Sequence, residues 1–181
     1  AVRQALKSGY NPATLLDLVA LGTVADVVQL DKNNRILVNQ GIQRIRQGHA
    51  SGGVTALLAV AGREASRIVA ADFGFALGPR VNAAGRMTEM GAGIECLLAE
   101  SRQQARPLAE ALEQINHQRR TVEGDVREEA ESIVASLSIG EENSAAGIAL
   151  YQPHWHEGVI GIVAGRIKEQ LHRPVIVFAR G

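Results

Sequence analysis

Gly147-Ile148-Ala149-Leu150-Tyr151 and Pro174-Val175-Ile176-Val177-Phe178-Ala179 decide the fold class of this chain of 181 residues. Both are short apolar runs of the kind that form strands. Between them, apolar residues from Gly158 to Leu171 recur at helical spacing. A strand, a helix and a second strand within about 35 residues is the length of a right-handed βαβ unit. The segment therefore predicts an α/β fold, and no strand is expected before Ser144.

A polar, turn-rich stretch at residues 140–144 precedes this unit and predicts a domain boundary. Upstream of it, Ser101 and Gln104 match a capping box, and the apolar residues that follow keep to one helical face as far as Leu137. Pro107 is expected to kink or fray the first turns. We therefore expect a helix at 101–139 that connects one domain, at 1–100, with the start of another, at 140–181.

The first hundred residues predict a series of short helices, so the chain should be mostly helical. Asn11-Pro12 is expected to start a helix that ends at Gly22, and Asp31 is expected to cap the next one. Asp72 is expected to cap a turn that runs to Leu77. The expected helices cover residues 12–21, 32–45, 54–61, 72–77 and 94–99.

The composition is that of a soluble globular protein, with 46% hydrophobic and 21% charged residues. No apolar run is long enough to predict a membrane-spanning helix. The net charge is zero, whereas a free-standing nucleic-acid-binding protein usually carries a basic excess. Aromatic residues make up 3% of the chain, which argues against a base-stacking surface. Any binding of phosphate must therefore come from local clusters or from parts of the protein outside this chain.

Two features bear on the setting of the chain. Cys96 lies in an apolar run and is interpreted as a core residue rather than a nucleophile or a disulfide partner, which fits a reducing cytoplasm. The first residues contain neither an initiator Met nor a signal peptide, and the apolar run that ends at Ala179 has nothing after it to cover it. We therefore expect an internal fragment of a longer cytoplasmic protein.

A second stretch, Gly78-Pro79-Arg80-Val81-Asn82-Ala83-Ala84-Gly85-Arg86, carries the most distinctive chemistry. The guanidiniums of Arg80 and Arg86 are planar forks suited to phosphate oxygens, and Asn82 can both donate and accept. Gly78 and Gly85 allow the backbone to come close to a ligand. The stretch predicts a loop that clasps phosphate, and a surface loop with two solvated arginines explains it equally well.

Asp26 lies between apolar neighbours, so its carboxylate needs a partner if it is buried. A divalent cation would supply one and a cap or turn another, and the spacing favours the cap or turn. Farther along, His156 and the free amides from Gly158 onward face a point above a helix N-terminus, which suits an anion. Arg166 is two turns along that helix and could reach a phosphate or an acidic side chain.

Other polar residues have plainer explanations. His154 and His156 have the spacing of a metal-binding pair on a strand, but without a third ligand a zinc site is disfavoured. Trp155 is expected to pack in the core. The pairs Glu141-Glu142 and Arg119-Arg120 are interpreted as solvated faces.

Three stretches, at residues 16–28, 77–87 and 155–169, together resemble the DHH/DHHA1 phosphoesterase family. They occur in the family's order and cover nearly the whole chain. The first is shared across the family in looser form, and the other two are more specific to its single-stranded-DNA exonucleases. On this resemblance, residues 1–100 are the C-terminal part of a DHH catalytic domain, 101–139 the connecting helix and 140–181 the start of a DHHA1 domain.

The resemblance implies a set of site residues and cofactors. Asp26 would be a ligand of a pair of Mn²⁺ or Mg²⁺ ions, which replaces its interpretation as a cap. The residues expected to face the substrate are Arg80, Asn82 and Arg86, which would contact phosphates, and His156, Gly158 and Arg166, at the edge of the DHHA1 domain. The family's Asp-His-His and Gly-Gly-His motifs should lie outside residues 1–181, so the isolated fragment is expected to be inactive.

The resemblance also implies an activity for the whole protein. It would be an exodeoxyribonuclease that releases nucleoside monophosphates from single-stranded DNA, 5′ to 3′, in recombination and repair. A single-strand-binding protein and a helicase would be its partners. Two alternatives stay open: a DHH phosphoesterase for short oligonucleotides or cyclic dinucleotides, and a non-catalytic DHH-like scaffold that binds single strands.

Overall fold

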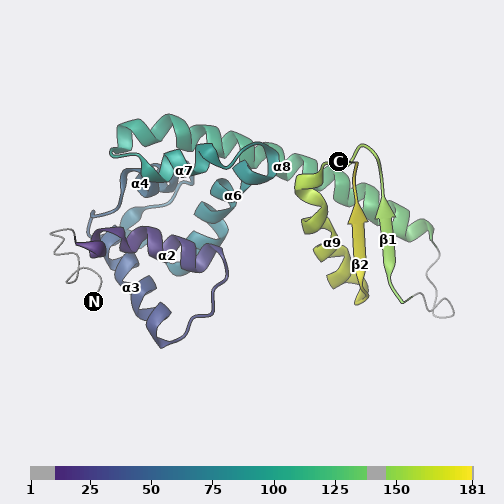
Figure 1. Ribbon diagram of the computed structural model, residues 1–181, viewed down its shortest axis with the longest axis horizontal. Helices are drawn as coiled ribbons and strands as arrows, with labels where there is room; N and C mark the ends of the chain where they lie inside the picture. The colour runs from purple at the N-terminus through teal and green to yellow at the C-terminus, as the bar shows by residue number, and fades with distance from the viewer. Residues whose placement is uncertain (1–10, 138–145, 181) are drawn as a thin grey trace, which may run out of the picture. The chain divides into compact units, whose positions relative to one another are not determined.

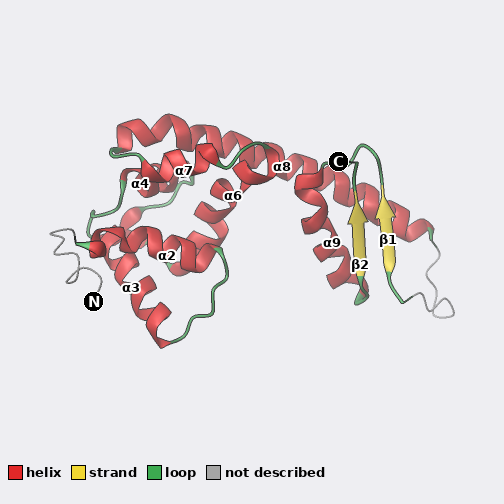
Figure 2. Ribbon diagram, in the orientation of Figure 1, coloured by secondary structure: helices red, strands yellow, loops and turns green. Residues whose placement is uncertain are grey.

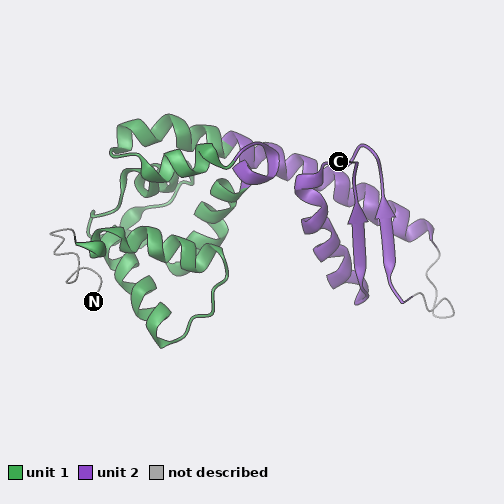
Figure 3. Ribbon diagram, viewed as in Figure 1, with its two compact units in different colours: residues 1–82, 90–113 green, residues 83–89, 114–181 purple. Residues whose placement is uncertain are grey.

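The computed structural model describes residues 11–137 and 146–180, and most of them are helical (Figure 1). Two short strands near the C-terminus form a sheet (Figure 2). The predicted fold class, an α/β chain that is mostly helical, is confirmed. The chain divides into two compact units (Figure 3): unit 1 comprises residues 1–82 and 90–113, and unit 2 comprises residues 83–89 and 114–181.

Unit 1 begins with the 3-10 turn Pro12–Leu15, followed by α2 (Leu16–Ala25). Asn11 caps the turn, since its side chain accepts the N–H of Ala13 at 3.2 Å. The prediction that this helix ends at Gly22 is wrong. The carbonyl of Gly22 accepts the N–H of Asp26 at 3.0 Å, so the helical bonding continues past the glycine.

The next helix, α3 (Lys32–Arg46), begins after Asp31, as predicted. The Asp31 carboxylate accepts the N–H of Asn34 at 2.8 Å, which is the bond of an N-cap. α3 packs closely on α2 at Gly41, where a β-carbon would overlap the carbonyl oxygen of Leu16.

A second pair of helices in unit 1 is α4 (Gly52–Val60) and α7 (Gly91–Leu98). Ser51 caps α4, and Gly62, with φ of 64°, follows its end. The helix expected at residues 54–61 therefore begins two residues earlier, at Gly52. Cys96 of α7 is fully buried, as predicted, and burial raises the pKa of its thiol.

The stretch Gly78–Met87 is a helix, α6, and the prediction of a loop there is wrong. It continues directly from α5 (Ala70–Asp72) through a π-helical turn, Phe73–Leu77. Pro79 lies directly after the π-helical turn and has no N–H to donate to a carbonyl of that turn. Gly78 is required for packing rather than for a turn, because a β-carbon there would lie 3.0 Å from that of Ala25.

Asp72 also differs from its prediction. It is the last residue of α5 and does not cap the turn that follows. Its carboxylate reaches back to accept the N–H of Val69 at 2.9 Å, and it pairs with Arg63 at 3.2 Å. Asp72 therefore stabilises the start of α5.

The predicted long helix is confirmed as α8 (Arg102–Ser136). Ser101 accepts the N–H of Gln104 at 3.2 Å, as the capping box predicts. The helix is continuous through Pro107, so the expected fraying is not observed. A proline this close to the helix start removes a single backbone bond, to the carbonyl of Gln103.

In unit 2, β1 (Ile148–Tyr151), α9 (Glu157–Leu171) and β2 (Val175–Phe178) form the predicted βαβ unit. The strands are parallel, with Ile148 opposite Val175. The core residues include Leu150, Trp155, Val159, Val163, Ile167 and Val177. Trp155 is thus in the core, as predicted. The expected boundary at 140–144 and the Glu141-Glu142 pair lie outside the described residues. None of the described helices is long and apolar enough to cross a bilayer.

Candidate functional site

Asp26 ends α2 and is exposed to solvent. Its N–H bonds to the carbonyl of Gly22, but its carboxylate has no hydrogen bond or ion pair with any described residue. The next residue, Val27, has φ of 55°, which is rare for a β-branched side chain. The chain therefore turns sharply at this point and leaves the Asp26 carboxylate unneutralised.

Asp26 and Asn82 line the same cavity in unit 1, which has a volume of about 330 Å³. The two residues are far apart in sequence, and α2 and α6 bring them together. The remaining wall is largely apolar and includes Leu18, Leu21, Ala25, Val81, Met90, Ile94, Leu97 and Leu98. The polar groups of Asp26 and Asn82 are thus set against a hydrophobic wall, which is the usual composition of a ligand site.

Arg80 is directed into unit 1. Its Nη1 donates to the carbonyl of Ala76 at 2.6 Å, and its Nε forms an ion pair with Glu113 of α8. The residue is 8% exposed. Its guanidinium is therefore largely committed to the protein, unlike that of Arg86, which belongs to unit 2 and is exposed.

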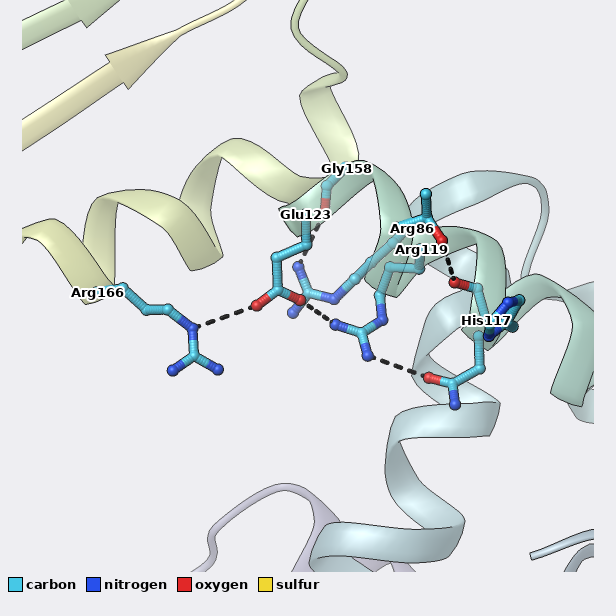
Figure 4. Close-up of polar contacts among 8 residues, drawn as sticks. Arg86, His117, Arg119, Glu123, Gly158 and Arg166 are labelled. Carbon is cyan, nitrogen blue, oxygen red and sulfur yellow. Dashed lines mark hydrogen bonds and ion pairs between the residues drawn. The ribbon is translucent and has the colours of Figure 1, made fainter. Parts of the chain in front are cut away.

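Arg86 and Gly158 meet in unit 2 (Figure 4). The Nη1 group of Arg86 donates to the carbonyl of Gly158 at 3.3 Å. A β-carbon at Gly158 would overlap the carbonyl oxygen of Arg86, so the close approach of the two backbones requires glycine. The glycine thus holds the end of α6 against the first turn of α9.

His156 is the N-cap of α9, and its Nδ1 accepts the N–H of Gly158 at 3.0 Å. With Nδ1 as the acceptor, the proton of the neutral ring is on Nε2. The ring therefore takes up one of the free amides of the helix start and keeps Nε2 as a donor for another group. His154, in contrast, bonds to Glu129 at 2.8 Å.

A chain of polar contacts lies beside Arg86 (Figure 4). Glu123 of α8 forms an ion pair with Arg119, one turn earlier, and a second with the Nε of Arg166 in α9 at 3.2 Å. Arg119 also donates to the side chain of Asn116 at 3.2 Å. Arg166 is 55% exposed, whereas the Glu123 side chain is 10% exposed.

The interpretation of Arg119-Arg120 as a solvated face is wrong for Arg119, whose side chain is 12% exposed, although Arg120 is exposed. Burial lowers the pKa of Arg119, and the positive charges of Arg120, Arg86 and Arg166 lower it further, against the opposing effect of Glu123. The cluster therefore holds more positive than negative charge, which favours binding of an anion.

The donor set for a metal ion is incomplete among the described residues. No group of three or more His, Cys, Asp or Glu side chains within residues 11–137 and 146–180 could hold a metal. A carboxylate oxygen is the ligand type that Mg²⁺ and Mn²⁺ prefer. Asp26 thus fits such an ion in kind, but it would be one ligand of several.

The sequence did not identify Glu113 or Glu123 as site residues and indicated a solvated face for Arg119, although the spacing of Arg119 and Glu123 offered a signal. Arg119 and Glu123 are four apart, the spacing of a helical ion pair, but such pairs are commonly exposed. The second partner of Glu123, Arg166, is 43 residues away in sequence and could not be inferred from that spacing. Glu113, the partner of Arg80, gave no local signal.

Comparison with known proteins places these residues in context. No family model matches the chain. The chain is 54% identical over 169 residues to the "Single-stranded-DNA-specific exonuclease RecJ" of Dickeya dadantii (strain 3937), covering 93% of this chain and 29% of that protein.

Two solved structures have the same fold. The crystal structure of RecJ in complex with Mg²⁺ from Thermus thermophilus matches 98% of this chain and 27% of its own, with a TM-score of 0.78 and 34% identity. A crystal structure of exonuclease RecJ bound to manganese matches 99% of this chain and 43% of its own, with a TM-score of 0.79 and 34% identity. In sequence and in fold, nearly all of the chain is thus similar to one segment of RecJ. This segment spans less than a third of the length of the curated relative.

Proposed function

We propose that the chain is part of an exonuclease specific for single-stranded DNA, which releases nucleoside monophosphates from the 5′ end. The observation that carries the proposal is the free carboxylate of Asp26 in a chain that matches RecJ over 93% of its length. We assign residues 1–100 to the C-terminal part of the DHH domain, 101–139 to the connecting helix and 140–181 to the start of the DHHA1 domain.

We propose that Asp26 is a ligand of Mn²⁺ or Mg²⁺, the ions held by the solved RecJ structures. When bound, such a pair of ions polarises the scissile phosphate and activates a water molecule. The other ligands come from residues outside the described part of the chain. Asp26 is exposed at the edge of the apolar cavity, and its carboxylate has no cationic partner among the described residues, so its charge is available to a cation.

For the substrate, we propose that Asn82, Arg86, His156, Gly158 and Arg166 face the DNA backbone. Arg86 and Arg166 are exposed guanidiniums, and His156 keeps Nε2 as a donor. Arg80 enters the proposal in a different role. Because its guanidinium is bonded to Ala76 and Glu113, we assign it to holding α6 in place for Asn82 rather than to direct contact with phosphate.

We further propose that the protein acts in the cytoplasm in recombination and repair, with a single-strand-binding protein and a helicase that supply its substrate. An exonuclease that needs single strands depends on a reaction that separates duplex DNA. The preference for single-stranded DNA in the relatives' names supports the need for such a reaction.

The test is the full-length protein with Mn²⁺ and a 5′-labelled single-stranded oligonucleotide. Asp26→Asn keeps the shape of the side chain and removes its charge, so we expect mononucleotide release to fall at least about 100-fold, the range for losing a group that stabilises the transition state. Glu100→Gln is the matched control, because Glu100 is also an exposed carboxylate of unit 1. It should leave the rate unchanged.

Full activity of Asp26→Asn would contradict the assignment of Asp26. A preference for dinucleotides over long strands would instead favour the phosphoesterase alternative, and binding without cleavage would favour the scaffold. The isolated 181-residue chain, which contributes one carboxylate ligand, should release no mononucleotides under the same conditions.

A further inference from the structure

Glu123 uses both of its carboxylate oxygens, and it uses them on two helices (Figure 4). Oε2 accepts from Nη1 of Arg119 in α8, and Oε1 pairs with Nε of Arg166 in α9. The residue is 8% exposed. A buried carboxylate is tolerated when charged donors occupy its oxygens, and here two guanidiniums do so.

Two largely buried residues, Arg119 and Asn116, fix the position of the Glu123 carboxylate. Arg119 holds it with one terminal nitrogen and donates with the other to Asn116, which is 1% exposed. The contacts thus run from Asn116 through Arg119 and Glu123 to Arg166. Three members are largely buried, and Arg166 is the exposed end.

Glu123 holds Arg166 through Nε, the guanidinium nitrogen nearest the main chain. The two terminal nitrogens of Arg166 make no hydrogen bond with any residue that the structure describes. Those terminal nitrogens form the fork that binds phosphate oxygens in pairs. Without Glu123, the long side chain of Arg166 would regain its rotamer freedom and would be repelled by Arg119.

We propose that Glu123 is a positioning residue for DNA binding, which holds the exposed fork of Arg166 in place for a backbone phosphate. This inference rests on the proposed function, because it requires that Arg166 contacts DNA. Glu123 acts through Arg166 and need not touch the substrate. It also lies outside the three stretches of sequence that carry the family resemblance.

The sign of the effect separates this role from simple electrostatics. A carboxylate near a phosphate repels it, so Coulomb's law alone predicts that neutralising Glu123 tightens DNA binding. If Glu123 positions Arg166, neutralising it weakens binding instead. Glu123→Gln therefore gives opposite results under the two explanations.

The experiment measures the dissociation constant of the full-length protein for a fluorescent single-stranded oligodeoxynucleotide, with EDTA present to prevent cleavage. We expect Arg166→Ala to weaken binding about tenfold and to lower the salt dependence by about one phosphate contact. Glu123→Gln should weaken binding roughly threefold in the wild-type background and have less than half of this effect, on a logarithmic scale, when Arg166 is already alanine.

Two further variants guard against loss of the fold. Arg166→Lys keeps the charge and the Glu123–Arg119 pair but lacks Nε and the fork, so it should lose most of the affinity that Arg166→Ala loses. Glu128→Gln is the matched control, an exposed carboxylate of the same helix, and it should bind as the wild type does. Circular dichroism of each variant checks the helices.

Tighter or unchanged binding by Glu123→Gln would overturn the inference, as would an equal loss with and without Arg166, which would indicate a purely structural role. Binding by Arg166→Lys at wild-type strength would also overturn it. Wild-type affinity of Arg166→Ala would remove Arg166 from the proposed function, and this inference with it. Failure of the wild type to bind single strands would refute the proposed function itself.

Discussion

The carbonyl oxygen of Arg86 occupies the place where a β-carbon of residue 158 would be, so Gly158 lets α9 begin there without displacement. The obstacle is backbone, which cannot rotate away as a side-chain tip could. The Nη1 group of the same arginine donates to the carbonyl of Gly158 at 3.3 Å. Arg86 of α6 thus contacts the start of α9 both through its backbone, which packs against Gly158, and through its side chain, which bonds to the carbonyl of Gly158.

Gly158→Ala should therefore destabilise unit 2. We expect a loss of about 1–3 kcal/mol, the usual range for forcing an extra carbon into a packed site. Hydrogen exchange of residues 146–180 in the full-length protein would report it as faster exchange. Gly161→Ala is the control, since that glycine lies in the same helix with nothing within 4 Å of its added carbon. Equal exchange in the two variants would contradict the prediction.

Glu129 should make the stability of unit 2 depend on pH. Its Oε2 accepts from Nε1 of Trp155 and bonds to Nε2 of His154, each at 2.8 Å, and these bonds, that of Trp155 first, lower the pKa of the carboxyl. A carboxylate with a lowered pKa contributes stability that is present above its unfolded pKa and is lost as the pH falls through the folded value.

The measurement is the thermal midpoint of wild type and Glu129→Gln between pH 7 and pH 3. The wild type should melt higher at pH 7, and the difference should shrink below about pH 4, near the ordinary pKa of glutamate. Glu128→Gln, at an exposed neighbour, should melt as the wild type does at every pH. A difference that stays constant down to pH 3 would refute the prediction.

Asp17 should matter more for stability than the exposed helix cap Asp31. Asp17 is fully buried, and its carboxylate accepts the N–H of Ser51 at 2.6 Å and that of Leu18 at 2.9 Å. Asp17→Ala would leave the partly buried N–H of Ser51 without its partner, at a cost of about 2 kcal/mol. Asp31→Ala removes an exposed cap and should cost about 1 kcal/mol. The midpoints of urea unfolding of the two variants would test this. Equal decreases in the midpoint for Asp17→Ala and Asp31→Ala would contradict the prediction.

Arg80 and Arg86 should differ in what they support. Arg80→Met removes the bond to Ala76 and an ion pair in which the arginine is buried and Glu113 is partly exposed, so it should lower the stability of unit 1 by about 1–3 kcal/mol. Arg86→Met should change stability by less than about 0.5 kcal/mol, as exposed sites do, but weaken DNA binding about tenfold. Thermal unfolding and fluorescence titration would measure the two effects. A tenfold loss of affinity in a fully stable Arg80→Met variant would reverse the assignment.

The elements that could be predicted from the sequence are those fixed by local bonds. Asp31 and Ser101 cap helices because their side chains bond to an N–H three residues later, and such a bond needs no partner from elsewhere. The βαβ unit followed from the same kind of information, since its strands and its helix have different apolar periods.

The parts that could not be predicted depend on distant neighbours. A glycine before a proline can close a turn or let two helices approach, and at Gly78 the nearby Ala25 of α2 decides between them. Arg119 and Glu123 likewise form a pattern that is usually exposed, but both are largely buried here, and Glu123 also pairs with Arg166 of α9, which is distant in sequence. Asp26 is an intermediate case. Its position between apolar residues marked it in the sequence as a carboxylate that needs a partner, whereas the cavity that it shares with Asn82 became evident only from the fold.

The π-helical turn at Phe73–Leu77 holds one residue more than an α-helical turn would. Each residue of an α-helix advances the side chains by about 100° around the axis. Deleting one residue here would leave an ordinary helix that still packs through Phe73, but Asn82 would be rotated by that amount and would no longer share a wall with Asp26. The number of residues in this five-residue segment, more than their chemistry, therefore determines the direction in which the polar side chains of α6 point around the helix axis.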